Sequence, residues 1–154
     1  MMRLFSTLAI LLAVLVLCST SMAQELPLQY AVKFVCGKRT ASRAFAIGTY
    51  FTTVNVHNPG REPAVFLKKF AVALPNQKAG PVTKLVEAKL GSDDAFAVEC
   101  GEIMERTHSA GFVEGFMVIE SRVELDVVAV YTTAGSTGQV ETMELERVPV
   151  RRAQ

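Results

Sequence analysis

The side chains able to do chemistry in this sequence are few and scattered. His57 and His108 are its two histidines, and they could bind a metal ion together with nearby carboxylates or a thiol. The candidate partners are Glu99, Cys100, Glu102 and Glu105. No pair of these residues has a recognised metal spacing, and the step from Glu105 to His108 is equally typical of a solvated helix surface. We therefore predict no metal site.

Nucleophilic chemistry finds little support. Ser136 lies in Gly135-Ser136-Thr137-Gly138, which lacks the Gly-x-Ser-x-Gly spacing of a nucleophile elbow and suits a hairpin turn better. Asp93-Asp94 has the composition of a turn, with a calcium loop as the weaker alternative. We predict no catalytic residue, no cofactor and no enzyme activity. The alternative of a small extracytoplasmic hydrolase would rest on Glu102 or His108 as its acid or base.

The cysteines are expected to have a structural role and not a reactive one. Cys36 and Cys100 are the two cysteines of the sequence after residue 23, and a single disulfide between them is the simplest interpretation for an oxidising compartment. A reactive thiol would need a lowered pKa or a Cys-x-x-Cys pair, and the sequence has no such pair.

The beginning of the sequence indicates where the protein works. Arg3 precedes an unbroken apolar run from Leu8 to Leu17, and Ser21-Met22-Ala23 supplies small residues for cleavage. We predict a signal peptide over 1–23, a mature chain starting at Gln24 and a periplasmic or secreted location. A lipoprotein anchored at Cys18 is the alternative, although the large Leu17 before it is unfavourable. No later segment has the roughly 20 apolar residues of a spanning helix.

The rest of the chain has the size and charge of one soluble domain. Residues 24–154 are expected to form a single domain that ends in a frayed tail at Arg151-Arg152. The full sequence has 16 Lys and Arg residues against 15 Asp and Glu residues, so loss of Arg3 leaves a balance of 15 to 15. These charges are interspersed, whereas a nucleic-acid binder gathers a basic excess into a stripe. Nucleic acid is therefore not an expected partner.

The fold is predicted from short runs of strand-forming residues. In the run from Thr49 to His57, Tyr50, Thr52, Val54 and Val56 would share one face, which is the two-residue period of a strand. Pro75 to Pro81 is expected to be a loop. We predict an all-β fold, an antiparallel β-sandwich of about seven to eight strands with at most one short helical turn between Gly101 and Ser109. The strand runs are Tyr30 to Cys36, Thr49 to His57, Ala64 to Leu74, Val82 to Leu90, Ala95 to Cys100, Phe112 to Ile119, Val123 to Thr132 and Val140 to Val148.

Two of these runs depart from simple alternation. In the run from Ala64 to Leu74 the apolar residues change phase at Lys68-Lys69, which predicts a β-bulge at an exposed edge. The segment from Val127 to Tyr131 is apolar on both faces. Such a strand is either buried from both sides or placed in an oligomer interface.

A resemblance to known proteins is carried by three segments, Tyr30–Gly37, Thr53–Pro59 and Glu124–Thr132, which resemble small exported bacterial proteins of unassigned function. The strand order and the apolar residues of 118–121 and 125–128 also resemble, at the level of pattern, the sensory rhodopsin transducer family. That resemblance implies a β-sandwich that assembles into oligomers and has no catalytic site, and it carries over no functional residue. The signal peptide departs from this family, whose members work in the cytoplasm.

These observations favour an exported, non-catalytic protein that acts by binding to itself, to an envelope partner or to a surface ligand. Besides the hydrolase, the remaining alternative is a carrier of a small apolar ligand, with aromatic side chains lining its groove. The candidate aromatics are Phe51, Phe66, Phe70, Phe112, Phe116 and Tyr131. Aromatic residues at strand spacing are more often part of a core, which we expect here.

Overall fold

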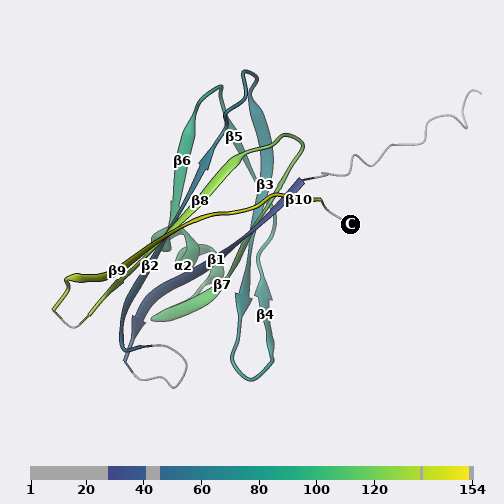
Figure 1. The fold of residues 1–154 in the computed structure, drawn as a ribbon. Coiled ribbons are helices and arrows are strands. Elements are labelled where there is room, and N and C mark those ends of the chain that lie inside the picture. The colour runs from purple at the N-terminus through teal and green to yellow at the C-terminus, as the bar shows by residue number, and fades with distance from the viewer. Residues whose placement is uncertain (1–27, 41–45, 136, 153–154) are drawn as a thin grey trace, which may run out of the picture.

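The computed structural model describes residues 28–40, 46–135 and 137–152 of the chain. The predicted signal peptide, the alternative lipid site at Cys18 and the candidate nucleophile Ser136 lie outside these residues. The described part contains ten strands and one helix (Figure 1). They are β1 (Leu28–Arg39), β2 (Gly48–His57), β3 (Ala64–Ala73), β4 (Ala79–Val82), β5 (Val86–Leu90), β6 (Ala95–Glu99), α2 (Cys100–Thr107), β7 (Phe112–Ser121), β8 (Asp126–Ala134), β9 (Val140–Arg147) and β10 (Arg151–Arg152).

The all-β, antiparallel character predicted from the sequence is confirmed, but the predicted sandwich of seven to eight strands is wrong. All ten strands belong to one open sheet, in the order β4-β3-β7-β1-β2-β8-β9, with β10 on β1, β5 on β3 and β6 on β2. The sheet is continuous because the end of β1 pairs with the start of β2, from Gly37 with Tyr50 to Arg39 with Gly48. The extra strands are the short β4 and β10. β4 occupies part of the expected loop, where an edge position tolerates Pro81.

The single sheet has two halves that face each other across the core. We call β10, β1, β7, β3, β4 and β5 the β1 wing, and β6, β2, β8 and β9 the β2 wing. Phe66 of β3 stacks on Phe96 of β6 with ring centroids 5.8 Å apart, although these strands are far apart in the hydrogen-bonding order. In Figure 1, β9 reaches the lower left of the molecule and β4 the lower right. The fully buried core side chains include Tyr30, Val32, Phe34, Val54, Val56, Phe66, Met117, Ile119 and Val127.

The predicted bulge at Lys68-Lys69 is wrong. β3 alternates regularly there, with Phe66, Lys68 and Phe70 buried on the core face and Lys69 on the other face. β3 is also flanked on both sides, by β7 and by the short strands β4 and β5. Its register shifts further along, between Ala71 and Ala73 opposite β4. The Lys68 side chain therefore enters the core from a regular strand.

The middle of β1 has a strand on one side only. Between Tyr30 and Cys36 it pairs with β7, while β2 and β10 reach only its two ends among the described residues. Side chains of the β2 wing satisfy the other edge. The Thr52 hydroxyl accepts from the Val35 N–H and donates to the Val35 carbonyl, both at 2.9 Å, and the Tyr131 hydroxyl lies 3.0 Å from the Lys33 carbonyl. Hydroxyl groups thus take the place of a neighbouring strand at this edge.

The helix α2 closes one end of the core. It has eight residues, about two turns, and so is longer than the single turn predicted for this region. Ile103 is fully buried beneath it, and the buried Lys68 ammonium pairs with Glu102 at 2.7 Å. The helix ends at Thr107 and is capped by His108, which adopts a left-handed conformation. No helix in the described part of the chain is long and apolar enough to cross a membrane.

The chain terminus is paired at its last described residues. Arg151 and Arg152 form β10 opposite Gln29 and Leu28, so the tail expected to fray at these arginines is held against β1 instead. Residues 153 and 154 lie outside the description.

Candidate interaction surface

The outer face of the β2 wing is apolar over three neighbouring strands. The register places Phe51, Thr132 and Met143 side by side, and next to them Thr53, Val130 and Leu145. Phe51, Met143 and Leu145 are 48%, 73% and 69% exposed. We call this surface, made by residues 51, 128, 130, 132, 143 and 145, the outer apolar face. Large exposed apolar patches on a folded domain mark sites of interaction.

The strand predicted to be apolar on both sides, β8, lies in the middle of this surface. Its residues Val127 and Ala129 point into the core and are fully buried, while Val128 and Val130 point to the outer face and are only half-buried. The described part of the chain places no further layer over them. The sequence allowed β8 either to be buried on both sides within one chain or to lie in an oligomer interface. The described residues bury only one side of β8.

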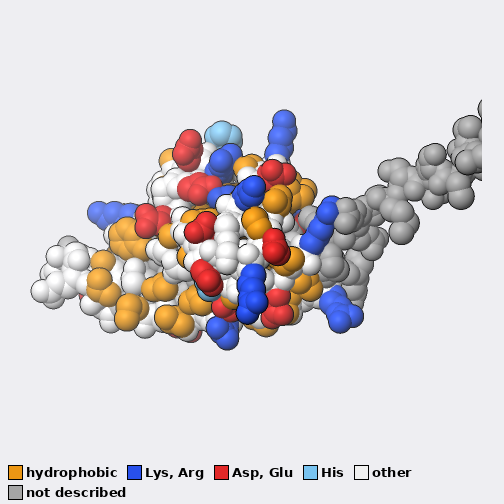
Figure 2. Space-filling model, turned by 90° about the horizontal axis from the view of Figure 1, so that it is seen from above, with side chains coloured by type: hydrophobic (Ala, Val, Ile, Leu, Met, Phe, Trp, Pro, Cys, Tyr) orange, Lys and Arg blue, Asp and Glu red, His pale blue; other side chains and the backbone are white. Residues whose placement is uncertain are grey.

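The strand β9 is an edge of the sheet and pairs only with β8 in the described structure. Its outward residues Met143 and Leu145 are apolar, and its other face carries Glu144 and Glu146. In Figure 2 hydrophobic side chains gather toward the left end of the molecule, where the β8–β9 hairpin lies. An exposed edge strand with an apolar face is a template for pairing with another chain.

The first of the two candidate histidines, His57, has acidic side chains as its neighbours. The His57 Nδ1 lies 3.4 Å from Asp126 Oδ2, and its Nε2 lies 4.0 Å from Asp93 Oδ1. Arg147 also pairs with Asp126, at 3.3 Å. This charged cluster joins the ends of β2, β8 and β9. In the part of the chain that the structure describes, no group of three metal-ligating side chains comes together.

The other candidate acids and bases have structural partners. Glu102 pairs with Lys68 and lies 3.7 Å from Arg106. His108 follows the end of α2, and its backbone N–H donates to the Glu105 carbonyl. The helix therefore stops before it can present Glu105 and His108 on one regular face. Glu102 and His108 are not assembled into an acid and base pair by any contact among the described residues.

Asp93-Asp94 forms the predicted turn. The Asp94 carboxylate accepts from the Gly91 N–H at 2.8 Å, and Asp93 has a positive φ of 56°. Asn58 fixes this turn from the neighbouring loop, since its backbone N–H donates to the Asp94 carbonyl and its own carbonyl accepts from Asp93. Hydrogen bonding within the turn accounts for this acidic pair.

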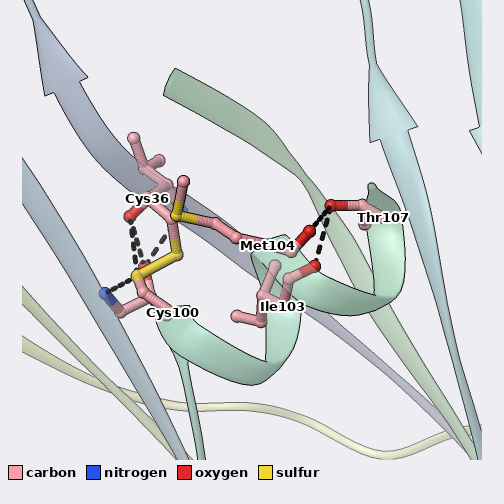
Figure 3. The surroundings of a disulfide bond; sticks show 7 residues. Cys36, Cys100, Ile103, Met104 and Thr107 are labelled. Carbon is pink, nitrogen blue, oxygen red and sulfur yellow. Dashed lines mark hydrogen bonds between the residues drawn. A yellow bond between two sulfur atoms is a disulfide. The ribbon is translucent and has the colours of Figure 1, made fainter. Parts of the chain in front are cut away.

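The structure joins Cys36 and Cys100 by a disulfide, with their Cα atoms 5.5 Å apart. Cys36 belongs to the core face of β1, and Cys100 is the first residue of α2. Figure 3 shows the bond beside the first turn of the helix, with the Met104 side chain reaching toward it. The Thr52 N–H lies 3.1 Å from the Cys100 sulfur. The bond thus ties the helix to the unpaired edge of β1, where the two wings meet.

The candidate aromatics divide between core and surface. Phe66 and Phe70 are buried, as expected for core residues, but Phe51 and Phe116 are 48% and 44% exposed. The polar contacts of the Tyr131 hydroxyl were not predicted, because one partner, Lys33, is 98 residues away and the other, Glu146, lies on the next strand. Lys68 was also missed, although its place between Phe66 and Phe70 on one face was a usable signal.

Comparison with known proteins adds the fold alone. No protein-family model matches the chain, and no curated protein matches it in sequence. Among solved structures, it is similar to the crystal structure of Thermotoga maritima 1070, with a TM-score of 0.52 and 11% sequence identity. The match covers 83% of this chain and 96% of that one. The arrangement of strands is therefore shared with a protein of very different sequence.

Proposed function

We propose that this protein is an exported, non-catalytic binding module that associates through the outer apolar face and the free edge of β9. The observation that carries the proposal is the exposure of Met143 and Leu145 on an edge strand, beside Phe51 and the half-buried side of β8. Burying such a surface is favoured by about 25 cal/mol for each Å² of apolar area removed from water.

A second copy of the chain is the partner that the proposal favours. A surface built on an edge strand can meet its own copy around a two-fold axis, where both the apolar face and the strand edge are self-complementary. The pattern likeness to an oligomeric family supports the same choice. An envelope protein with an exposed strand is the alternative partner of the same surface.

Export is proposed from two independent features. The apolar run ending at Leu17 and the small residues up to Ala23 have the form of a signal peptide. The disulfide between Cys36 and Cys100 is typical of proteins that fold in an oxidising compartment. We expect the mature chain to begin at Gln24 and to be periplasmic or secreted.

The test is the subunit number of the protein purified from the extracytoplasmic fraction, measured by sedimentation over a range of concentrations. We expect a multiple of a subunit starting at Gln24, and a monomer for Leu145→Lys. Val82→Lys is the matched control, because Val82 is a 61% exposed apolar residue on β4, which is also an edge strand and lies in the other wing. A wild-type chain that stays monomeric, or equal behaviour of the two variants, contradicts the proposed surface.

A further inference from the structure

A groove of about 360 Å³ lies between the unpaired edge of β1 and the strands β8 and β9. Its lining includes Lys33 of β1, Tyr50 of β2, Tyr131 of β8, and Glu144 and Glu146 of β9. Sites for small ligands are concave, with apolar walls and a few polar groups, and their volumes begin at about 300 Å³. The groove is therefore large enough for a small organic ligand.

The sheet register places the aromatic and acidic side chains on one face. Tyr131 is opposite Thr52 on one side and Glu144 on the other, and Tyr50 is opposite Thr133. Tyr50 and Tyr131 are thus diagonal neighbours on adjacent strands, and Glu144 is the direct neighbour of Tyr131.

Hydrogen bonds and ring contacts hold these walls in place. The Tyr131 hydroxyl lies 2.8 Å from a Glu146 carboxylate oxygen and 3.0 Å from the Lys33 carbonyl. The Tyr50 ring meets Phe112 edge to face, with centroids 5.7 Å apart. These contacts hold the two tyrosines in place, and both side chains are half-buried.

The described lining of the groove carries more negative than positive charge. Among the residues that the structure describes, two carboxylates, Glu144 and Glu146, face one ammonium, that of Lys33. That ammonium pairs at 2.5 Å with a third carboxylate, Glu114, and lies 5.4 Å from the centre of the Phe116 ring on β7. The negative potential is also felt by the Tyr131 phenol, whose pKa is raised by burial and further by Glu146 and Glu144.

We propose that this groove binds an organic cation, an ammonium group attached to a short carbon chain. Aromatic faces attract cations through their quadrupole, and carboxylates attract them by charge, so the two wall types favour the same ligand. The carbon chain would lie against Val35 and the tyrosine rings. An anionic ligand would face two carboxylates at close range. The inference does not rest on the proposed self-association. Tyr131, Glu144 and Glu146 lie on the opposite face of β8 and β9 from Met143 and Leu145, and the groove shares only residues 51 and 132 with the outer apolar face.

The test measures binding of choline and n-butylamine to the full mature protein by calorimetry. Each cation is compared with its neutral counterpart, 3,3-dimethyl-1-butanol for choline and n-butanol for butylamine. We expect at least one cation to bind at least about tenfold more tightly than its neutral counterpart, which corresponds to about 1.4 kcal/mol. Binding is also expected to weaken as salt is added, because screening reduces the charge attraction.

Matched variants locate the site. The double variant Glu144→Gln, Glu146→Gln should lose about tenfold in cation affinity, whereas Glu87→Gln, an exposed carboxylate of β5, should leave it unchanged. Unchanged thermal unfolding shows that both variants are folded. The inference is overturned if neither cation binds below about 10 mM, if the neutral compounds bind equally well, or if the double variant binds like the wild type.

Discussion

Asn58 should be one of the most sensitive polar residues of this protein. Its side chain is 1% exposed and makes three hydrogen bonds to the backbone of two loops. The amide nitrogen donates to the carbonyls of Glu62 at 2.9 Å and Gly91 at 2.8 Å, while the amide oxygen accepts from the Gly60 N–H at 3.0 Å. The substitution Asn58→Ala removes all three bonds at once.

The expected cost follows from that geometry. A buried hydrogen bond contributes about 1 kcal/mol to stability, so the three bonds of Asn58 amount to about 3 kcal/mol. The backbone groups of Gly60, Glu62 and Gly91 lose this partner in the variant. For one domain of this size the midpoint of thermal unfolding should fall by about 10 °C.

Denaturant unfolding of Asn58→Ala and Asn55→Ala provides the measurement and its control. Asn55 lies three residues before Asn58, within β2, and its side chain is exposed, so its replacement should change the free energy of unfolding by less than about 0.5 kcal/mol. Asn58→Asp keeps the shape of the side chain, but it replaces the amide nitrogen that donates to two carbonyls by a carboxylate oxygen, which can only accept. It should be at least as destabilising at neutral pH and should recover stability as the pH falls and the new carboxyl is protonated. If Asn58→Ala and Asn55→Ala have equal effects, the reasoning about this side chain is refuted.

Three further predictions concern contacts between elements that are distant in sequence. Replacing Cys36 and Cys100 together by Ala should lower the free energy of unfolding by about 4 kcal/mol on the chain-entropy model, because the bond joins residues 64 positions apart. Denaturant titration of the oxidised protein and of the variant measures this difference. Glu102→Gln should cost about 1 to 2 kcal/mol, because the buried Lys68 loses its carboxylate, and adding Lys68→Met should recover most of that loss in a double-mutant cycle. The raised pKa of Tyr131, caused first by burial and then by Glu146, keeps this phenol protonated after an unfolded tyrosine ionises. Stability should therefore fall as the pH rises above about 10, and Tyr131→Phe should lessen that fall in alkaline unfolding curves.

Local patterns in the sequence predicted the strands well. The inward set Thr52, Val54 and Val56 of β2 is buried as the two-residue period requires. The pairing of Cys36 with Cys100 followed from cysteine number and compartment, and the structure has that bond. These features depend on residue type and spacing within one segment, which the sequence displays directly.

Features decided by pairing between distant segments were not predictable in this way. The junction of β1 with β2 consists of backbone pairing at Gly37 to Arg39, which has no side-chain pattern, so one sheet was mistaken for two. The partner of Lys68, Glu102, lies 34 residues away, so their ion pair has no local signal, although the position of Lys68 between Phe66 and Phe70 did indicate the core face. The groove residues Lys33 and Tyr131 are 98 residues apart and meet only once β8 crosses the edge of β1.

The partners of β1 and β2 come late in the chain. β1 pairs along its length with β7, which begins at Phe112, and β2 pairs along its length with β8, which begins at Asp126. The first two strands therefore have no long partner until the last third of the polypeptide has been made. Folds with such distant pairing form slowly, because closing a long loop costs chain entropy before the stabilising contacts between the strands have formed. The long pairings of β1 and β2 can therefore be completed only after β7 and β8 have been made, so most of the sheet is assembled at the end of synthesis.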